Sequence, residues 1–342
     1  MNPTQTIEKL ASGSALSQRE AYEMQSAILR GEVQTSALFE YFSALGARPP
    51  TSEELRGFFK ASLEAMTPLT TDIDTLDTCG TGGDGSGSFN ISTAAAILCA
   101  ATGVSVTKHG NRAASSTCGS ADVLEALGVK IELSPIAAKR VLTKCGFVFL
   151  FARSYHPAFR HAAEARKAYG RKTYFNLLGP LLNPARAAYR VHGLADFSLA
   201  PLLGEILIES GVKRALLVHA DDGLDEVSPA STTNVLEYSP KPPKALTVNP
   251  RVYRLFVPNR AGLAGGDAKA NADIMRMIFA GRGNEAQNAA VILNAAAGLY
   301  ASGRVRNLEE GTRAATAALM SGEAERKLAE IILVTNEAAS IL

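Results

Sequence analysis

From Ile73 onward the chain alternates between short β-rich runs and helical segments rich in alanine and leucine, and this alternation limits the possible folds most. The β-rich runs lie at 73–77, 104–108, 129–133, 147–151, 189–194, 215–220 and 235–239. Strands separated by helices favour a largely parallel sheet that helices cover on both faces. The pattern therefore predicts an α/β domain with a mainly parallel central sheet.

The first seventy residues have a purely helical pattern. Ser17 with Glu20, and Thr51 with Glu54, have the spacing of a capping box, in which two side chains satisfy N–H groups at a helix start. Residues 37–45 are predicted to form a short apolar helix. We expect a small all-helical domain at 1–70, which also recruits part of 165–190, and an α/β domain at 71–342.

Charge and composition exclude several classes of protein. The chain has 35 basic and 33 acidic residues and a net charge of +2, so we expect no nucleic-acid partner. Its alanine-rich stretches are too short to span a membrane, and MNPTQTIEKL at the N-terminus lacks the apolar core of a signal peptide. The four cysteines form no C-x-x-C pair, which disfavours a zinc site. We expect a cytoplasmic protein without membrane contact.

The segment DTCGTGGDGSGSFNIST, at 77–93, follows a predicted strand and precedes an alanine-rich helix. It has five glycines within eight positions, more than we expect a plain strand-to-helix turn to need. Glycines let successive N–H groups approach a ligand, and together with a helix N-terminus they form an anion site. Ser92 and Thr93 are candidates to cap the helix and to offer hydroxyls to a ligand or metal.

The same run also contains the G-x-G-x-x-G fingerprint of dinucleotide-binding folds, at Gly80, Gly82 and Gly85. That fingerprint requires the glycines to open the helix directly and an acid about twenty residues later. Here the second strand ends in Lys108 and His109, which suit a phosphate better than a ribose diol. An NADP-binding protein remains an alternative on this pattern alone.

Two further polar segments follow predicted strands. KHGNRAASSTCGSAD, at 108–122, combines basic side chains with hydroxyl groups, a mixture that binds phosphates. DDGLDEVSP, at 221–229, has four carboxylates in six residues, which repel one another unless solvent or a cation compensates. Such a turn alone is more often ordinary surface, but beside two phosphate-binding loops it favours Mg²⁺ shared with a diphosphate.

With these segments in this order, the chain resembles the anthranilate phosphoribosyltransferases nearly end to end. The resemblance rests on GTGGDGSGSFNIST, KHGNRAASS, GSADVLEALG, HPAF with RKAYG, NLLGPLLNPA, GLDEVSP and GGDAKANA. It implies a helical domain and an α/β domain, a homodimer joined through the helical domains, and Mg²⁺ as cofactor. The implied reaction transfers the phosphoribosyl group of phosphoribosyl diphosphate to the amino group of anthranilate, in tryptophan biosynthesis.

The resemblance also implies which residues form the site. Phosphoribosyl diphosphate would contact the glycine-rich run, the basic loop and the helix after it, at Gly80, Gly83, Asp84, Ser88, Asn90, Ile91, Ser92, Thr93, Lys108, His109, Gly110, Asn111, Arg112, Ala113, Ala114, Ser115, Ser116 and Ser120. Anthranilate would contact Gly80, Asn111, His156 and Arg166, with His109 along its route. The magnesium ligands would be Ser92, Asp225 and Glu226.

Some positions depart from the commoner family pattern. Ser88 stands where threonine is usual, Arg153 replaces a frequent proline, and GARPPT at 46–51 lacks the usual Lys-Gly-Glu turn. The alternatives are a nucleoside phosphorylase of the related fold, which needs no magnesium carboxylates, and a binding protein that has lost catalysis. The acid pair and the KHGN loop are both present, so we predict the transferase.

Overall fold

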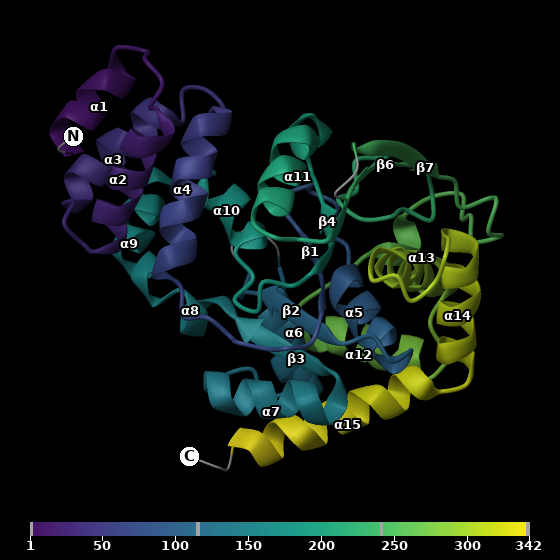
Figure 1. The fold of residues 1–342 in the computed structure, drawn as a ribbon. Coiled ribbons are helices and arrows are strands. Elements are labelled where there is room, and N and C mark those ends of the chain that lie inside the picture. The colour runs from purple at the N-terminus through teal and green to yellow at the C-terminus, as the bar shows by residue number, and fades with distance from the viewer. Residues whose placement is uncertain (1–2, 114–116, 240–241, 340–342) are drawn as a thin grey trace. The chain divides into compact units, whose positions relative to one another are not determined.

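The computed structural model describes residues 3–113, 117–239 and 242–339, which form two compact units (Figure 1). Unit 1 comprises Met1–Pro68 and Ala152–Pro184, and unit 2 comprises Leu69–Phe151 and Ala185–Leu342. The range 71–342, expected for the α/β domain, thus includes a segment at 152–184 that packs with the helical unit. That segment begins earlier than the expected part of 165–190.

The described residues of unit 1 form helices and their connections. The helices are α1 (Pro3–Ala11), α2 (Gln18–Leu29), α3 (Thr35–Leu45), α4 (Ser52–Ala65), α8 (Ala152–Tyr155), η1 (Pro157–Phe159), α9 (Arg160–Tyr169) and α10 (Phe175–Leu181). Phe58 on α4 stacks on Tyr174, with ring centroids 4.1 Å apart, and the Tyr174 hydroxyl donates to Gln25 Oε1 at 2.5 Å. These buried aromatic contacts attach the second segment to the first.

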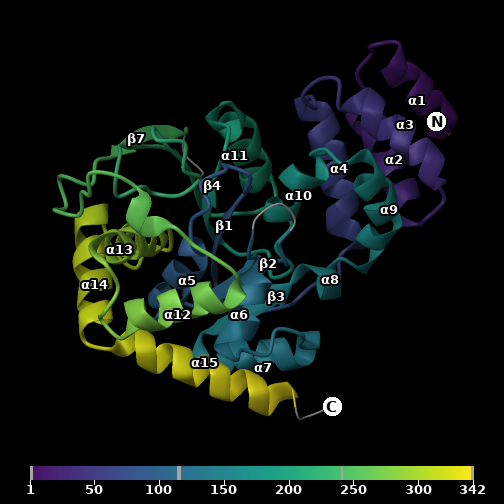
Figure 2. The same cartoon turned by 180° about the vertical axis from the view of Figure 1, so that it is seen from behind.

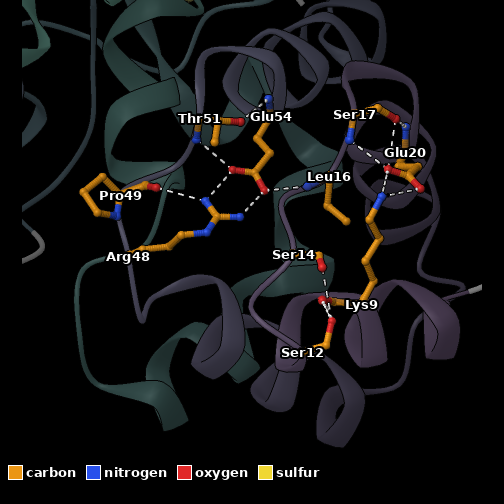
Figure 3. A network of polar contacts seen from close by, with 10 residues as sticks. All are labelled: Lys9, Ser12, Ser14, Leu16, Ser17, Glu20, Arg48, Pro49, Thr51 and Glu54. Carbon is orange, nitrogen blue, oxygen red and sulfur yellow. Dashed lines mark hydrogen bonds and ion pairs between the residues drawn. The ribbon is translucent and has the colours of Figure 1, made fainter.

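Both predicted capping boxes are present (Figure 3). In the second, the backbone N–H of Thr51 donates to Glu54 at 2.7 Å and that of Glu54 donates to the Thr51 hydroxyl at 3.2 Å. The buried Glu54 carboxylate also accepts from the N–H of Leu16 at 2.9 Å and from Arg48 at 2.6 Å. This capping box therefore also fixes the approach to α2.

Unit 2 is built on one seven-stranded sheet with the order β3-β2-β1-β4-β5-β6-β7. Its strands are β1 (Leu76–Gly80), β2 (Val106–Gly110), β3 (Phe147–Phe151), β4 (Tyr189–Gly193), β5 (Arg214–Ala220), β6 (Thr233–Tyr238) and β7 (Lys244–Val248). The first five are parallel, and β6 and β7 are antiparallel. The predicted mainly parallel sheet is confirmed.

One strand prediction was wrong and one strand was missed. Residues 129–133 are not a strand, although Val129, Ile131 and Leu133 are buried in alternation, because the N–H of Lys130 donates to the Thr335 hydroxyl instead of to a neighbouring strand. Conversely, β7 was not predicted. It is an edge strand with mostly exposed side chains, so it carries little hydrophobic pattern.

Helices pack around the sheet, and those from Ala261 onward follow its last strand, β7 (Figures 1 and 2). They are α5 (Ile91–Ala101), α6 (Ser120–Leu127), α7 (Pro135–Cys145), η2 (Phe197–Leu199), α11 (Ala200–Glu209), η3 (Ala261–Leu263), α12 (Ala268–Phe279), α13 (Glu285–Ala301), α14 (Leu308–Met320) and α15 (Glu323–Ala339). The C-terminal α15 lies along α7. Within the described ranges, no helix is long and apolar enough to cross a membrane.

The connections change direction between β1 and β4. The crossover through α5 leads from β1 to β2 on one side of the sheet order, whereas the crossover through α11 leads from β4 to β5 on the other. Right-handed crossovers therefore place α5 and α11 on opposite faces. In open α/β sheets, ligands bind beyond the carboxyl ends of the strands at such a switch point.

Candidate active site

Two glycines in register end the strands at the switch point. Gly80 ends β1 and pairs with Gly193 at the end of β4. A Cβ atom on Gly80 would lie 2.5 Å from Asp225 Oδ2, and one on Gly193 would overlap the carbonyl oxygen of Asp225. The absence of side chains at these two positions therefore makes room for the acidic loop that follows β5.

The loop from β1 to α5 has the conformation that its glycines allow. Four of them have positive φ angles, which side chains rarely adopt: Gly82 (64°), Gly83 (75°), Gly85 (68°) and Gly87 (63°). Position 80 requires a glycine because a Cβ there would lie too close to the Asp225 carboxylate. The expectation that the run has more glycines than backbone geometry requires is therefore wrong for this loop.

The start of α5 also differs from the prediction. The helix begins at Ile91 with Asn90 at the N-cap, so Ser92 and Thr93 lie within the first turn and do not cap it. The Asn90 side chain makes no capping bond, and instead donates to the Cys118 carbonyl at 3.1 Å and accepts from Asn271 at 2.9 Å. Asn90 therefore connects the glycine-rich run to the loop before α6 and to α12.

The acidic loop contacts both ends of the glycine-rich run. Gly82 N–H donates to Asp225 Oδ2 at 2.8 Å, and the N–H of Asp225 donates to Asp84 Oδ2 at 3.3 Å. The N–H of Ser92, in the first turn of α5, donates to Glu226 Oε1 at 3.1 Å. Residues about 140 positions apart in the sequence thus form one cluster of carboxylates at the switch point.

The carboxylates of this cluster have too little positive charge around them. Burial and then the neighbouring Asp84 raise the pKa of Asp225, and burial and then Asp225 raise the pKa of Glu226. The buried Lys108 ammonium offsets part of this, donating to the Thr78 carbonyl at 2.6 Å and to the Ser92 hydroxyl at 3.3 Å. Burial lowers the pKa of Lys108, while Asp77 and Glu226 oppose that effect. Such a cluster favours a further cation.

The basic loop after β2 is held partly by its own ion pairs. Arg112 forms ion pairs with Asp122, at 3.1 Å, and with Glu125. The N–H groups of Ala113 and Gly119 each donate to Asp122 at 2.9 Å. Arg112 was predicted to contact phosphate, but its guanidinium is engaged with carboxylates here. These contacts order the backbone on both sides of residues 114–116.

Known proteins match nearly the whole chain. The family model described as the glycosyl transferase family helical bundle domain matches residues 4–66, and that of the glycosyl transferase family a/b domain matches 72–325. An anthranilate phosphoribosyltransferase of Methanobrevibacter smithii is 41% identical over 97% of this chain and 99% of its own, and one of Geobacillus kaustophilus is 42% identical over 95% and 96%. The chain belongs to the anthranilate phosphoribosyltransferase family.

Solved structures agree with this membership. The anthranilate phosphoribosyltransferase of Thermus thermophilus has a TM-score of 0.89 and 39% identity, covering 97% of this chain and 99% of its own. The enzyme of Saccharomyces cerevisiae, in complex with PRPP and Mg, has a TM-score of 0.88 and 26% identity, covering 98% of each chain. Membership confirms the predicted enzyme class, a transferase that moves the phosphoribosyl group of phosphoribosyl diphosphate to anthranilate in tryptophan biosynthesis, over the nucleoside phosphorylase.

The predicted family residues in unit 2 lie around the switch point. Gly80 ends β1, the loop to α5 has Gly83, Asp84 and Ser88, and α5 begins with Asn90, Ile91, Ser92 and Thr93. On the neighbouring strand, Lys108, His109 and Gly110 end β2, Asn111, Arg112 and Ala113 follow it, and Ser120 begins α6. Ala114, Ser115 and Ser116 lie outside the described residues.

The predicted family residues His156 and Arg166 belong to unit 1. His156 Nε2 donates to the Leu182 carbonyl at 3.0 Å, and burial lowers the His156 pKa to about 4, so its imidazole is neutral at pH 7. Arg166, on α9, lies 4.9 Å from the centre of the Phe175 ring, and burial lowers its pKa. A guanidinium supported on an aromatic ring keeps its bidentate edge for a carboxylate.

Three contributors to the cluster were missed by sequence reasoning. Gly193 and Asn294 carry no motif of their own, and Asn271 lies in GGDAKANA, a segment of the family resemblance to which no role was assigned. Asn271 accepts from the N–H of Gly266 at 2.7 Å and donates to Asn90. A buried asparagine in an alanine-rich helix is the signal that could have identified Asn271 and Asn294, because buried amides require partners.

Proposed function

We propose that Asp225 and Glu226, with Ser92, hold Mg²⁺ against the diphosphate of phosphoribosyl diphosphate at the switch point. The observation that carries the proposal is the place of both carboxylates at the switch point, where Asp225 accepts from the N–H of Gly82 and Glu226 from that of Ser92, with the buried Lys108 nearby. Burial raises the pKa of both carboxylates. Carboxylate and hydroxyl oxygens are ligands that Mg²⁺ accepts, together with waters and phosphate oxygens. The Saccharomyces cerevisiae relative, whose structure is a complex with PRPP and Mg, supports the use of Mg²⁺ with this substrate.

We further propose that the glycine-rich run and the basic loop bind the rest of this substrate. The first turn of α5 presents the positive end of the helix dipole beside Lys108, which suits the diphosphate. Asn111, Ala113 and Ser120 flank the segment expected to surround the phosphoribosyl group, and the Ser120 hydroxyl donates to the Asn111 carbonyl at 3.4 Å. The ion pairs of Arg112 would keep this loop ordered for binding.

Anthranilate completes the proposed reaction. Of its predicted contacts, Gly80 and Asn111 belong to unit 2, and His156 and Arg166 belong to unit 1. We propose that Arg166 binds the carboxylate of anthranilate, for which a guanidinium is the best-matched side chain. The neutral imidazole of His156 would leave the aromatic ring an uncharged neighbour.

In this reaction the protein mainly positions the two substrates and neutralises the charge of the leaving diphosphate. The amine nitrogen forms a bond to C1 as the C1–O bond to diphosphate breaks, and the resulting arylammonium releases a proton. An aromatic amine is already unprotonated at neutral pH, so no strong general base is required. Bound Mg²⁺ would stabilise the negative charge of the leaving diphosphate. Lys108 and the α5 N-terminus would act on the same charge, and alignment of the amine would supply much of the remaining rate.

The test replaces the acid pair by neutral isosteres. We expect Asp225→Asn and Glu226→Gln each to raise the Mg²⁺ concentration for half-maximal activity by roughly 10-fold or more, because ligand charge is lost. The decrease of anthranilate fluorescence on addition of phosphoribosyl diphosphate measures turnover. Asp221→Asn is the matched control, since Asp221 lies in the same loop but is exposed and accepts from Asn234. Unchanged Mg²⁺ dependence in folded Asp225 and Glu226 variants would refute the proposal.

We also propose that the protein is a cytoplasmic homodimer, as the family resemblance implies. Sedimentation equilibrium measures the mass in solution, to be compared with 36.0 kDa for one chain. A mass of one chain at micromolar concentration contradicts the dimer.

A further inference from the structure

We propose that Asn294 is a positioning residue that fixes the backbone of the acidic loop while Asp225 and Glu226 bind their ligand. The inference rests on the role proposed above for that acid pair. Asn294 lies on α13 and is 2% exposed. Its carboxamide accepts from the N–H of Val227 and donates to the carbonyl of Val227, both at 2.9 Å. Val227 directly follows Glu226 and is itself buried.

The two bonds fix both the place and the orientation of one peptide segment. The second amide hydrogen of Asn294 donates to the Ala290 carbonyl at 2.9 Å, so the side chain is also fixed on its own helix. The α13 helix packs against β1, β4 and β5, the strands that surround the switch point. Asn294 therefore ties the acidic loop to the framework of the sheet.

The other contacts of the loop act through the carboxylates themselves or at residues farther along the chain than Val227. The contacts through Asp84, Asp225 and Glu226 use carboxylate oxygens, which a metal would take over in part. The N–H of Ser228 donates to the Thr233 hydroxyl at the start of β6, the Ser228 hydroxyl donates to Asp222, and the Pro229 carbonyl accepts from the N–H of Val257. These contacts hold the loop beyond Val227, farther from the acid pair. The Asn294 contact uses only the backbone of Val227, so it can persist while both carboxylates change partners.

The chemistry of the position explains why an amide is needed. An asparagine offers two donors and one acceptor, and all three functions are used here. Aspartate has nearly the same shape but would face two carbonyl oxygens with a carboxylate, and alanine would leave the buried N–H and carbonyl of Val227 without this partner. The loop would then be less well placed for a ligand.

The test compares two asparagines of the same helix. We expect Asn294→Asp and Asn294→Ala to weaken Mg²⁺ binding roughly 10- to 100-fold, as the loss of a residue that supports metal ligands does. Calorimetric titration of Mg²⁺ into the protein with phosphoribosyl diphosphate measures this independently of turnover. Asn288→Ala is the control, because Asn288 lies on α13 and donates to the Gly283 carbonyl at 2.9 Å, outside the acidic loop. This control variant should lower the unfolding temperature without weakening Mg²⁺ binding.

The outcomes are distinguishable. If Asp225→Asn weakens Mg²⁺ binding but the folded Asn294 variants do not, the positioning role of Asn294 is wrong and the proposed role of the acid pair is unaffected. The same conclusion holds if Asn288→Ala weakens Mg²⁺ binding as much as the Asn294 variants do. If Asp225→Asn has no effect either, the proposed function fails first. If neither Asn294 variant folds, amide hydrogen exchange at Val227 of the unmodified protein decides. Its protection must persist when Mg²⁺ and phosphoribosyl diphosphate are added, and fast exchange in that state overturns the inference.

Discussion

Replacing Gly193 by alanine tests whether the end of β4 determines the place of the acid pair. The new Cβ would overlap the carbonyl oxygen of Asp225 and lie 2.7 Å from its carbonyl carbon, whereas real Cβ atoms essentially never come within 3.0 Å of such an atom. The obstacle is backbone on both sides, so the acidic loop has to retreat by more than 1 Å. A misplacement of about 1 Å can already cost on the order of 100-fold in rate. This corresponds to about 2.7 kcal/mol of transition-state stabilisation.

The assay follows anthranilate fluorescence at saturating and at limiting Mg²⁺. We expect Gly193→Ala to lose about 100-fold in kcat/KM, and overpacking to lower the free energy of unfolding by about 1–3 kcal/mol. Gly204→Ala is the steric control, because its Cβ would approach the Tyr238 ring, 2.8 Å from Cζ, between α11 and β6. It should lose similar stability and keep its activity. A folded Gly193→Ala enzyme within threefold of the unmodified rate would refute the argument.

Three further predictions concern stability, pH and the basic loop. Glu54→Ala should lower the free energy of unfolding by about 3 kcal/mol, measured in urea, because the buried carboxylate accepts from two backbone N–H groups and from the half-buried Arg48; a loss below about 1 kcal/mol contradicts this. Burial lowers the pKa of His192 from 6.5 to about 3, so the unfolded chain takes up the proton first and the stability contributed by neutral His192 is lost as the pH falls below 6.5. His192→Asn should therefore flatten the loss of stability between pH 6.5 and 5 by about 2 kcal/mol, and an unchanged slope in urea titrations would exclude it. Arg112→Lys loses the bidentate contact with Glu125 and should raise the KM for phosphoribosyl diphosphate roughly tenfold; steady-state kinetics with an unchanged KM contradict the role of this ion pair.

Local patterns predicted much of the fold. The capping boxes at Ser17 and Thr51 form as expected, since their partners lie three residues apart. The parallel strands were recognised because their side chains are apolar and buried on both faces, as in β3. The pattern alone failed at 129–133, where buried side chains alternate although the described part of the chain has no partner strand for them. It also failed at β7, which is a strand because it pairs with β6, while its mostly exposed side chains give no strand pattern. Strand identity depends on a neighbour that the local sequence does not contain.

The sequence by itself determined which groups are available to the site: the glycines of 80–87, the basic residues after β2 and the acid pair after β5, each a run of neighbouring residues. Only the tertiary structure decided how these runs meet. Gly193 makes room for Asp225, and Asn294 holds Val227 from 67 positions away. Such contacts depend on strand order and helix packing, which bring distant residues within hydrogen-bond distance, and a single residue without a motif gives no local sign of its partner. The same reason explains the raised pKa values of Asp225 and Glu226, because burial is a property of the folded protein.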